Sequence, residues 1–312
     1  MMQFGLIGIG AGAAAALLFA SVTSGVWLSI PLFYLAPLPI MIAGLGWSHW
    51  SALIAALAGA LGLGAIFGPV LFFTFLAAAG GPAWWLSYLA MLARPAGKDA
   101  AALEWYPAGR LVLWAAILGA LVVIVAIPNF GLDAESFRTG LRQSVAHTLG
   151  VDSEVSANTD RLIDFLVAAI PPGAAVVSNI ITLINLWLAG IIVKFSGRLS
   201  RPWPALASMT FPRPVLAGLG AAVALSFAGG LVSIIAGVVS ASLLMAYGVL
   251  GLAVLHAITH GMASRVFLLA AVYFAVLLLG WPMLLLCLLG LIEAVVDLRA
   301  RIAATRGPPA LT

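Results

Sequence analysis

Residues 32–64 read LFYLAPLPIMIAGLGWSHWSALIAALAGALGLG and contain no aspartate, glutamate, lysine or arginine. A helix needs about 20 mainly apolar residues to cross the hydrocarbon core of a bilayer. The stretch holds most of two such helices, at 27–46 and 51–67. The same pattern continues from Phe4 to Leu298, with charged residues confined to short gaps. The sequence therefore predicts a polytopic membrane protein.

The composition indicates the same class. Of the 312 residues, 64% are hydrophobic and 8% are charged, whereas soluble domains carry about 25% charged residues. The net charge of +4 comes from basic residues that cluster in predicted cytoplasmic loops, so the positive-inside rule explains it and no nucleic-acid partner is expected. The single cysteine, Cys287, cannot form an intrachain disulfide. No cofactor is expected.

The predicted fold class is all-α, a transmembrane helix bundle of about 8–10 spans with a periplasmic amphipathic helical segment. The apolar runs lack the alternation of period two that barrel strands need. The apolar blocks lie at 4–23, 27–46, 51–67, 70–93, 110–128, 173–194, 215–235, 238–258 and 266–297. Gly280-Trp281-Pro282 interrupts the last block, which predicts either two short arms or one kinked helix.

Charge orients the spans. Loop 194–213 is basic without any acid and loop 94–110 is weakly positive, so both are predicted to be cytoplasmic. The acid-rich stretch 131–170 is then periplasmic. Both termini are predicted to be cytoplasmic in a bacterial inner membrane, and the first apolar run is predicted to be a retained span. The predicted segments are N-terminal transmembrane helices at 1–130, a periplasmic segment at 131–170, C-terminal transmembrane helices at 171–298 and a cytoplasmic tail at 299–312.

Two amphipathic helices are predicted within 133–165. The first begins at the acidic string Asp133-Ala-Glu, and the second follows a possible N-cap at Asn158-Thr159-Asp160. Their apolar stripes are Phe137, Leu141, Val145 and Leu149 in the first and Leu162, Phe165, Leu166 and Ala169 in the second. The two helices could form a simple cap over the bundle, a gate over a cavity or a docking surface for a partner.

Small residues recur at steps of four in two predicted spans. Because they allow helix backbones to approach closely, they predict either packing within the chain or a face that receives a partner membrane protein. The candidate docking residues are Gly8, Gly12 and Ala16 in the first span and Ala52, Ala56 and Ala60 in the third.

The span at 173–194 carries a polar face, and polar side chains at membrane depth must face protein or water. They predict either hydrogen bonds between helices or a ligand pocket with aromatic walls, whereas an interfacial aromatic belt is the alternative for the rings. The candidate ligand-binding residues are Ser178, Asn179, Thr182 and Asn185 together with Trp84, Trp85 and Tyr88.

Other polar residues suggest no chemistry of their own. His256 and His260 lie one helical turn apart, but a zinc site needs three or four ligands, so no metal is predicted. Glu293 is interpreted as the first residue of an exposed ladder with Asp297 and Arg301, with a buried functional acid as the alternative. Nucleotide-binding and catalytic motifs are missing, so the chain is not expected to be an enzyme, and a membrane enzyme acting on lipid ranks third.

The N-terminal string is the most distinctive part of the sequence. Ser24-Gly25, the run at 32–64 and PAWWLSYLAMLARPA at 82–96 resemble the DUF2232 membrane family in its alphaproteobacterial branch. The chain is more distantly similar to YybS-like proteins. A remote likeness to the substrate-binding S components of energy-coupling-factor vitamin transporters and to MreD implies a Gly/Ala-rich helical bundle, and the family has no established catalytic residues.

Two functional hypotheses follow from this resemblance and the residues. The first is a transport-type module that binds a small solute or lipid-like ligand within the bundle and depends on a separate energising complex. The alternative is a non-transporting envelope scaffold, like MreD, that recruits partner proteins. In both cases the lipid bilayer surrounds the chain.

Overall fold

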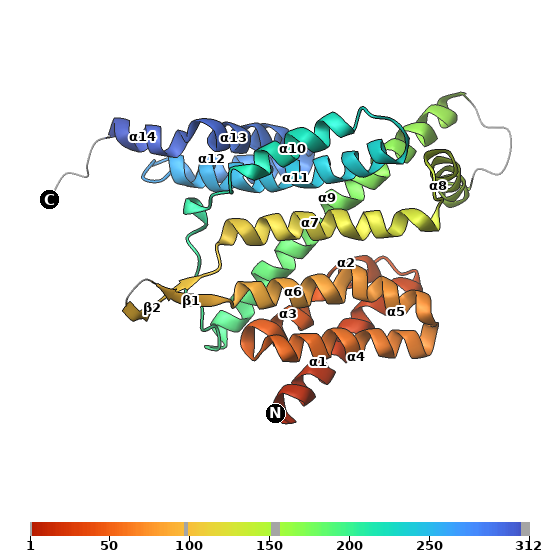
Figure 1. Cartoon of the computed structure of the whole chain (residues 1–312), viewed down its shortest axis with the longest axis horizontal. Helices are drawn as coiled ribbons and strands as arrows, with labels where there is room; N and C mark the ends of the chain where they lie inside the picture. The colour runs from red at the N-terminus through yellow and green to blue at the C-terminus, as the bar shows by residue number, and fades with distance from the viewer. Residues whose placement is uncertain (1, 97–98, 151–156, 307–312) are drawn as a thin grey trace. The chain divides into compact units, whose positions relative to one another are not determined.

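The computed structural model describes residues 2–96, 99–150 and 157–306, and helices dominate this part of the chain (Figure 1). The first eight helices are α1 (Met2–Ala20), α2 (Ser29–Tyr34), α3 (Pro37–Gly46), α4 (His49–Phe67), α5 (Pro69–Phe75), α6 (Gly81–Ala90), α7 (Ala108–Ala126) and α8 (Ala134–Thr148). The others are α9 (Ala157–Phe195), α10 (Pro214–Leu225), α11 (Gly230–Ile258), α12 (Arg265–Leu279), α13 (Pro282–Val296) and α14 (Leu298–Arg306). Short 3₁₀ turns lie at Ser21–Ser24, Ile127–Asn129 and Leu206–Ser208, and a π-turn lies at Leu76–Gly80.

Seven helical segments of the described residues are long and apolar enough to cross a membrane. They are Gln3–Ser24, Ser29–Gly46, His49–Phe67, Pro69–Ala90, Ala108–Asn129, Ala157–Phe195 and Gly230–Ile258. Helices α10, α12 and α13 are apolar but shorter. The predicted class, an all-α polytopic helix bundle, is therefore confirmed.

Contacts between residues divide the chain into two compact units that alternate along the sequence. Unit 1 contains Met1–Pro107, Ile117–Val125 and Ala174–Trp203, and unit 2 contains Ala108–Ala116, Ala126–Gly173 and Pro204–Thr312. Helices α7 and α9 each contribute residues to both units. This division is based on packing, and it differs from the four segments predicted from membrane topology.

In unit 1, α1 packs closely against α4 through small residues (Figure 1). A methyl group at Gly12 would lie 2.5 Å from the carbonyl oxygen of Ala55, and one at Gly8 would lie 2.8 Å from that of Ser51. Helices α3 and α6 meet in the same way, because Gly44 lies directly against the side chain of Ser87. Close backbone approach thus provides van der Waals packing, which stabilises helix contacts in lipid, where the hydrophobic effect does not drive helices together.

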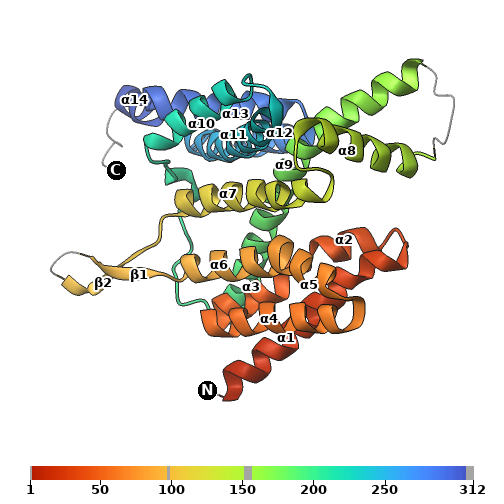
Figure 2. The same cartoon turned by 45° about the vertical axis from the view of Figure 1, so that its right-hand side comes forward.

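Arg201 also holds unit 1 together. Its guanidinium donates to the carbonyl oxygens of Ala90, at 2.9 Å, and Tyr106, at 2.8 Å. These carbonyls flank a short antiparallel hairpin of β1 (Ala93–Ala96) and β2 (Asp99–Trp105), which extends from the end of α6 (Figure 2). Burial lowers the pKa of the Arg201 guanidinium, which nevertheless stays charged. The hairpin was not predicted, because the sequence around it reads as a short charged loop.

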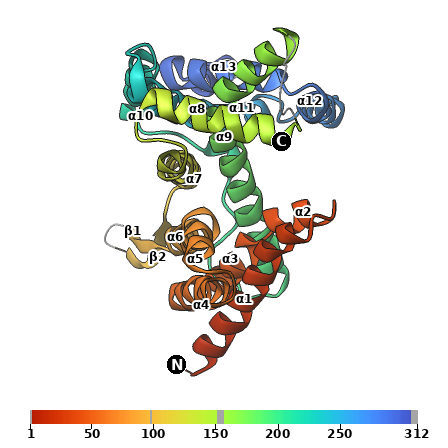
Figure 3. The same ribbon diagram turned by 90° about the vertical axis from the view of Figure 1, so that its right-hand side faces the viewer.

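In unit 2, α11 and α13 lie side by side (Figures 1 and 3). A methyl group at Gly251 would collide with the carbonyl oxygen of Leu286, and one at Gly290 would collide with that of Tyr247. The hydroxyl of Ser242 donates to the carbonyl oxygen of Ala116, at 2.7 Å, and so joins α11 to the first part of α7. Two glycines and one serine therefore set the spacing in this unit.

Glycines interrupt two of the apolar blocks, and the sequence predicted one of these two breaks. The last apolar block is two separate helices, α12 and α13, with a break at Gly280 (φ +72°), so the two-arm alternative is confirmed. The block predicted at 215–235 is wrong. It breaks between α10 and α11, where Gly229 (φ +79°) and Gly230 (φ +63°) take left-handed conformations that glycine adopts at little cost.

The predicted boundary between the segment at 131–170 and the span at 173–194 is also wrong, because α9 runs through Pro171-Pro172-Gly173 without interruption. Two adjacent prolines remove only two backbone donors, whereas ending the helix would leave up to eight backbone groups unsatisfied in an apolar setting. The predicted N-cap at Asn158-Thr159-Asp160 lies inside the first turn of α9. Asp152 and Glu154 of the predicted periplasmic segment lie outside the described residues.

The interpretation of Glu293 as part of an exposed ladder is wrong as well. Its side chain is buried, and its Oε1 accepts a hydrogen bond from Nε of Arg299 at 2.7 Å. The helix ends before Asp297, whose φ of +52° turns the chain, so Arg301 does not continue the row. Arg299 also donates to the carbonyl oxygens of Ala207 and Met209, which anchors the loop before α10.

Candidate functional site

The predicted polar face of α9 is buried in unit 1. Asn179, Thr182 and Asn185 are all less than 5% exposed, and Ser178 is half-buried. Nδ2 of Asn185 donates to the carbonyl oxygen of Tyr34, at 2.9 Å, and to that of Ile181, at 2.8 Å. The amide therefore joins α9 to the end of α2.

The predicted aromatic wall forms a cluster of its own on α6. The ring centroids of Trp84 and Trp85 are 5.9 Å apart, and those of Trp85 and Tyr88 are 5.8 Å apart. Tyr88 in turn meets His49 edge-on at 5.3 Å. The amide of Asn185 bonds to α2 and not to these rings.

The predicted docking residues lie inside unit 1. Gly8 and Gly12 are pressed against α4, Ala52, Ala56 and Ala60 are at most 1% exposed, and Ala16 is half-buried. This is the geometry of packing within the chain, the alternative that the sequence left open.

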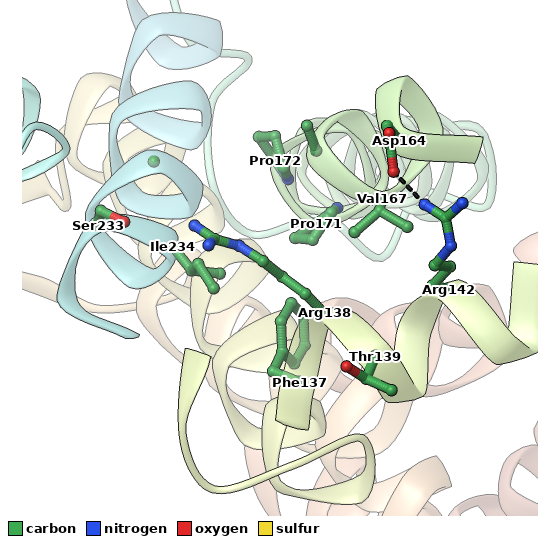
Figure 4. Close-up of a pocket in the computed structure, with 12 residues that line it drawn as sticks. Phe137, Arg138, Thr139, Arg142, Asp164, Val167, Pro171, Pro172, Ser233 and Ile234 are labelled. Carbon is green, nitrogen blue, oxygen red and sulfur yellow. Dashed lines mark hydrogen bonds and ion pairs between the residues drawn. The ribbon is translucent and has the colours of Figure 1, made fainter. Parts of the chain in front are cut away.

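The described part of unit 2 contains a pocket of about 480 Å³ between α8, α9 and α11 (Figure 4). The residues that line it are Phe137, Arg138, Thr139 and Arg142 of α8, Asp164, Val167, Ala168, Pro171 and Pro172 of α9, and Ser233, Ile234 and Gly237 of α11. None of the predicted ligand-binding residues is among them.

The apolar part of the pocket belongs to a small core. The predicted stripe of α8 is buried at Phe137, Leu141 and Val145, where it packs with Ile163, whereas Leu149 at the end of the stripe is exposed. On α9 the predicted stripe is only partly confirmed: Leu166 packs against this core, whereas Leu162 and Phe165 are 49% and 66% exposed and Ile163 is buried instead.

A capping box fixes the start of α8. Oδ1 of Asp133 accepts hydrogen bonds from the backbone N–H groups of Glu135 and Ser136, each at 3.0 Å. The hydroxyl of Ser136 accepts from the backbone N–H of Asp133 in return. These hydrogen bonds, led by the backbone bond from Ser136, hold the pKa of the Asp133 carboxyl below its ordinary value of 3.8. The cap thereby fixes the first turn that carries Phe137 and Arg138.

The two arginines of the pocket differ in their partners. Arg142 bonds to Asp160, at 2.6 Å, and to Asp164, so two carboxylates of α9 neutralise it. Arg138 lies one turn earlier, and its side chain extends toward Ser233 and Ile234 of α11 (Figure 4). Among the described residues, its guanidinium has no hydrogen-bond or ion-pair partner. The pocket therefore presents one uncommitted positive charge beside apolar side chains.

The opposite wall contains a Pro-Pro pair that leaves two backbone acceptors of α9 without their usual donors. In a helix, the carbonyl of residue i accepts from the N–H of residue i+4, but Pro171 and Pro172 have no N–H. The carbonyl oxygens of Val167 and Ala168 therefore lack their usual donors. Residues four apart lie on one face of a helix, and all four of these residues line the pocket.

Sequence reasoning did not find this pocket. It recognised both amphipathic stripes but interpreted Pro171-Pro172 as a boundary. A Pro-Pro pair directly after a helical stripe, with an arginine beside the stripe on the preceding helix, was the available signal. The predicted His256 and His260 pair lies elsewhere, with Nε2 of His256 bonded to the hydroxyl of Tyr273 at 3.0 Å. The described residues contain no group of three or more His, Cys, Asp or Glu that could hold a metal.

Comparison with curated proteins gives no match, and comparison with solved structures gives none either. A family model described as "Predicted membrane protein (DUF2232)" matches residues 13–294. The match covers both units and every lining residue of the pocket. The chain therefore belongs to the DUF2232 family of predicted membrane proteins.

Proposed function

We propose that this protein is a membrane-embedded binding module of the transport type, which takes an amphiphilic, lipid-like ligand with one anionic group into the pocket of unit 2. The observation that carries the proposal is the pairing of an uncommitted guanidinium, Arg138, with an apolar wall in one cavity. Small-molecule pockets are mostly apolar with a few placed polar groups, and they measure about 300–1,000 Å³. The volume of about 480 Å³ lies within that range.

The position of the pocket along α9 supports an amphiphile. The 39 residues of α9 span about 58 Å, roughly twice the hydrocarbon core of a bilayer. Apart from Lys194 at its far end, its charged residues Asp160, Arg161 and Asp164 lie within its first eight residues, and mainly apolar residues follow. Pro171 lies seven residues, or about 10 Å, beyond Asp164. The pocket thus spans the boundary between the charged and the apolar parts of one helix.

Transport would need an external source of energy, because the sequence contains no nucleotide-binding motif. We propose that a partner complex supplies it. The proposal keeps the predicted orientation in a bacterial inner membrane, with 131–170 in the periplasm and both termini in the cytoplasm. A reporter that is active only in the periplasm, fused after Gly150, should be active, and an inactive fusion would reverse the orientation.

The test compares native lipid retention in two single variants. Wild type, Arg138→Ala and Arg161→Ala are purified in mild detergent, and their bound molecules are identified by native mass spectrometry. Arg161 is a matched control, because it is exposed on α9 and does not line the pocket. We expect a stoichiometric amphiphile in wild type and Arg161→Ala that is depleted in Arg138→Ala.

The scaffold alternative predicts a different result. If all three proteins carry the same lipids in the same amounts, the pocket binds nothing specifically. Recovery of cell-envelope proteins with every variant would then favour a scaffold and would contradict the binding module.

A further inference from the structure

We infer that the pocket between α8, α9 and α11 selects a zwitterionic phospholipid headgroup, with its phosphate at Arg138 and its primary ammonium at the carbonyl oxygens of Val167 and Ala168. The inference rests on the proposed function and goes further, because it names the chemistry of the ligand. The inference is based on two walls of opposite polarity. One wall carries the positive charge of Arg138, and the other carries the carbonyl oxygens of Val167 and Ala168, which lack their usual donors.

The anion subsite follows from the charges. Arg142 is held by Asp160 and Asp164, so this group of three carries a net negative charge of one and leaves Arg138 as the cation available to a ligand. A guanidinium binds phosphate oxygens through up to two parallel hydrogen bonds. Asp164 also lines the pocket, so a ligand with two negative charges would be repelled there, whereas a phosphodiester with one charge matches the single free guanidinium.

The donor subsite follows from the prolines. An acceptor without a donor in an apolar setting is costly, so a ligand that brings N–H groups to Val167 and Ala168 relieves that cost. A primary ammonium has three N–H donors and also complements the carboxylate of Asp164 on the same wall. A quaternary ammonium has the same charge and no N–H. The wall should therefore distinguish ethanolamine from choline headgroups.

The apolar lining favours a lipid over a free headgroup. Phe137, Val167 and Ile234 line the pocket together with the polar groups, and α11 continues from there as a long apolar helix. Acyl chains attached to the headgroup would follow this surface. Glycerophosphoethanolamine, which keeps the singly charged phosphodiester but has no acyl chains, would fill the two polar subsites alone and should bind more weakly.

The experiment titrates the full-length protein in detergent with dioctanoyl phospholipids and follows binding by native mass spectrometry. The ligand series runs from phosphatidylethanolamine through its mono- and dimethyl derivatives to phosphatidylcholine, which removes the N–H donors one at a time. We expect affinity to fall by at least about tenfold across the series, since this is the lower value of one charge-assisted hydrogen bond and the two carbonyls accept two. Glycerophosphoethanolamine should compete at least about tenfold more weakly than the lipid, because it carries the same charges but lacks the apolar contacts of the acyl chains.

Two variants separate the subsites. Arg138→Ala should weaken every lipid of the series, whereas Pro171→Ala/Pro172→Ala restores both backbone donors and should abolish the preference for ethanolamine while phosphatidylcholine binding is unchanged. The double variant favours the helix, because alanine is the better helix former. Arg161→Ala is the control and should behave as wild type.

Each failure has its own meaning. Equal binding of all four lipids that still requires Arg138 would overturn the headgroup inference and leave the binding module intact. A preference for ethanolamine that persists in Pro171→Ala/Pro172→Ala would overturn the role of the carbonyls. Glycerophosphoethanolamine that binds as tightly as the lipid would overturn the assignment to a phospholipid. Loss of any dependence on Arg138 would overturn the proposed function itself.

Discussion

Replacing Arg299 with alanine removes one partner of a buried ion pair and leaves the other without compensation. The guanidinium of Arg299 donates to Oε1 of Glu293 at 2.7 Å and to the carbonyl oxygens of Ala207, at 2.6 Å, and Met209, at 2.9 Å. Side-chain exposure is 16% for Arg299 and 5% for Glu293, so water cannot easily replace the lost donors. The variant should therefore destabilise unit 2.

The size of the effect can be worked from this geometry. Breaking a buried ion pair costs about 3–5 kcal/mol, and the partial exposure of Arg299 places the expected loss near the lower end, at about 3 kcal/mol. A domain of this size loses roughly 2–4 °C of melting temperature for each kcal/mol, so the apparent Tm should fall by about 6–12 °C. Arg94→Ala breaks the exposed pair with Glu104, where the side chains are 76% and 52% exposed, and should cost no more than about 1 kcal/mol.

The chain carries its own probe for this measurement. Cys287 is the single cysteine, is 6% exposed and lies on α13, the helix that carries Glu293. A maleimide that fluoresces on reaction with thiols will report the temperature at which unit 2 opens. If Arg299→Ala melts within about 1 °C of Arg94→Ala, where the expected gap is several degrees, the stabilising role of the pair is refuted. Replacing Glu293 and Arg299 together by leucine and methionine should recover much of the loss, because it removes the unpaired charge.

Three further changes test other parts of the structure. Gly251→Ala should lower the free energy of unfolding by about 1–3 kcal/mol, because the added methyl group overpacks α11 against Leu286. The same thiol assay measures this loss, and Gly218→Ala, at a position with open space, should melt as wild type. The lowered pKa of Asp133 means that its charged form stabilises the first turn of α8 above pH 3.8 and that this stabilisation is lost as the pH falls through the lowered value. The protection of that turn against hydrogen exchange, after correction for the pH dependence of the intrinsic exchange rate, should therefore fall on acidification in wild type and change much less in Asp133→Asn. An equal fall in both proteins would contradict the role of the charge. Asn185→Asp places a buried carboxylate against two carbonyl oxygens, so the yield of monodisperse protein should collapse, while Asn185→Leu, which adds no charge, should be purified normally.

Hydropathy alone was sufficient to predict the class of the fold, because long apolar runs have few alternatives in a bilayer. The break at Gly280 was also predictable, since a glycine that can end one helix precedes a proline that can begin the next. The sequence predicted a helix boundary at Pro171-Pro172, where the helix continues, and a continuous helix through Gly229-Gly230, where it breaks. Proline was taken as a terminator, yet the surrounding hydrogen-bond ladder carries the helix through it, whereas two consecutive glycines inside an apolar run gave no change in hydropathy.

The candidate site was less accessible to sequence reasoning. Asn185 and its neighbours were correctly expected to face protein, but their partner, the carbonyl of Tyr34, is a backbone atom that carries no residue-specific signal. The pocket depends on which face of α9 turns toward α8. Ile163 is buried on that face, whereas Leu162, which was predicted to be buried, is 49% exposed. Such registers are set by packing between distant segments, which hydrophobic periodicity specifies only to within a residue or two.

The alternation of the two units along the chain has a consequence for how the protein is made. The carbonyl of Tyr34 is completed by Asn185, which is synthesised 151 residues later, and at 5–20 residues per second the ribosome needs about 8–30 s to cover that distance. The carbonyls of Ala90 and Tyr106 similarly lack this donor until Arg201 has been synthesised. Unit 1 is therefore left incomplete in the membrane for many seconds after most of it has been inserted. During that time its unfinished polar surface is open to the insertion machinery, to lipid and to other nascent chains.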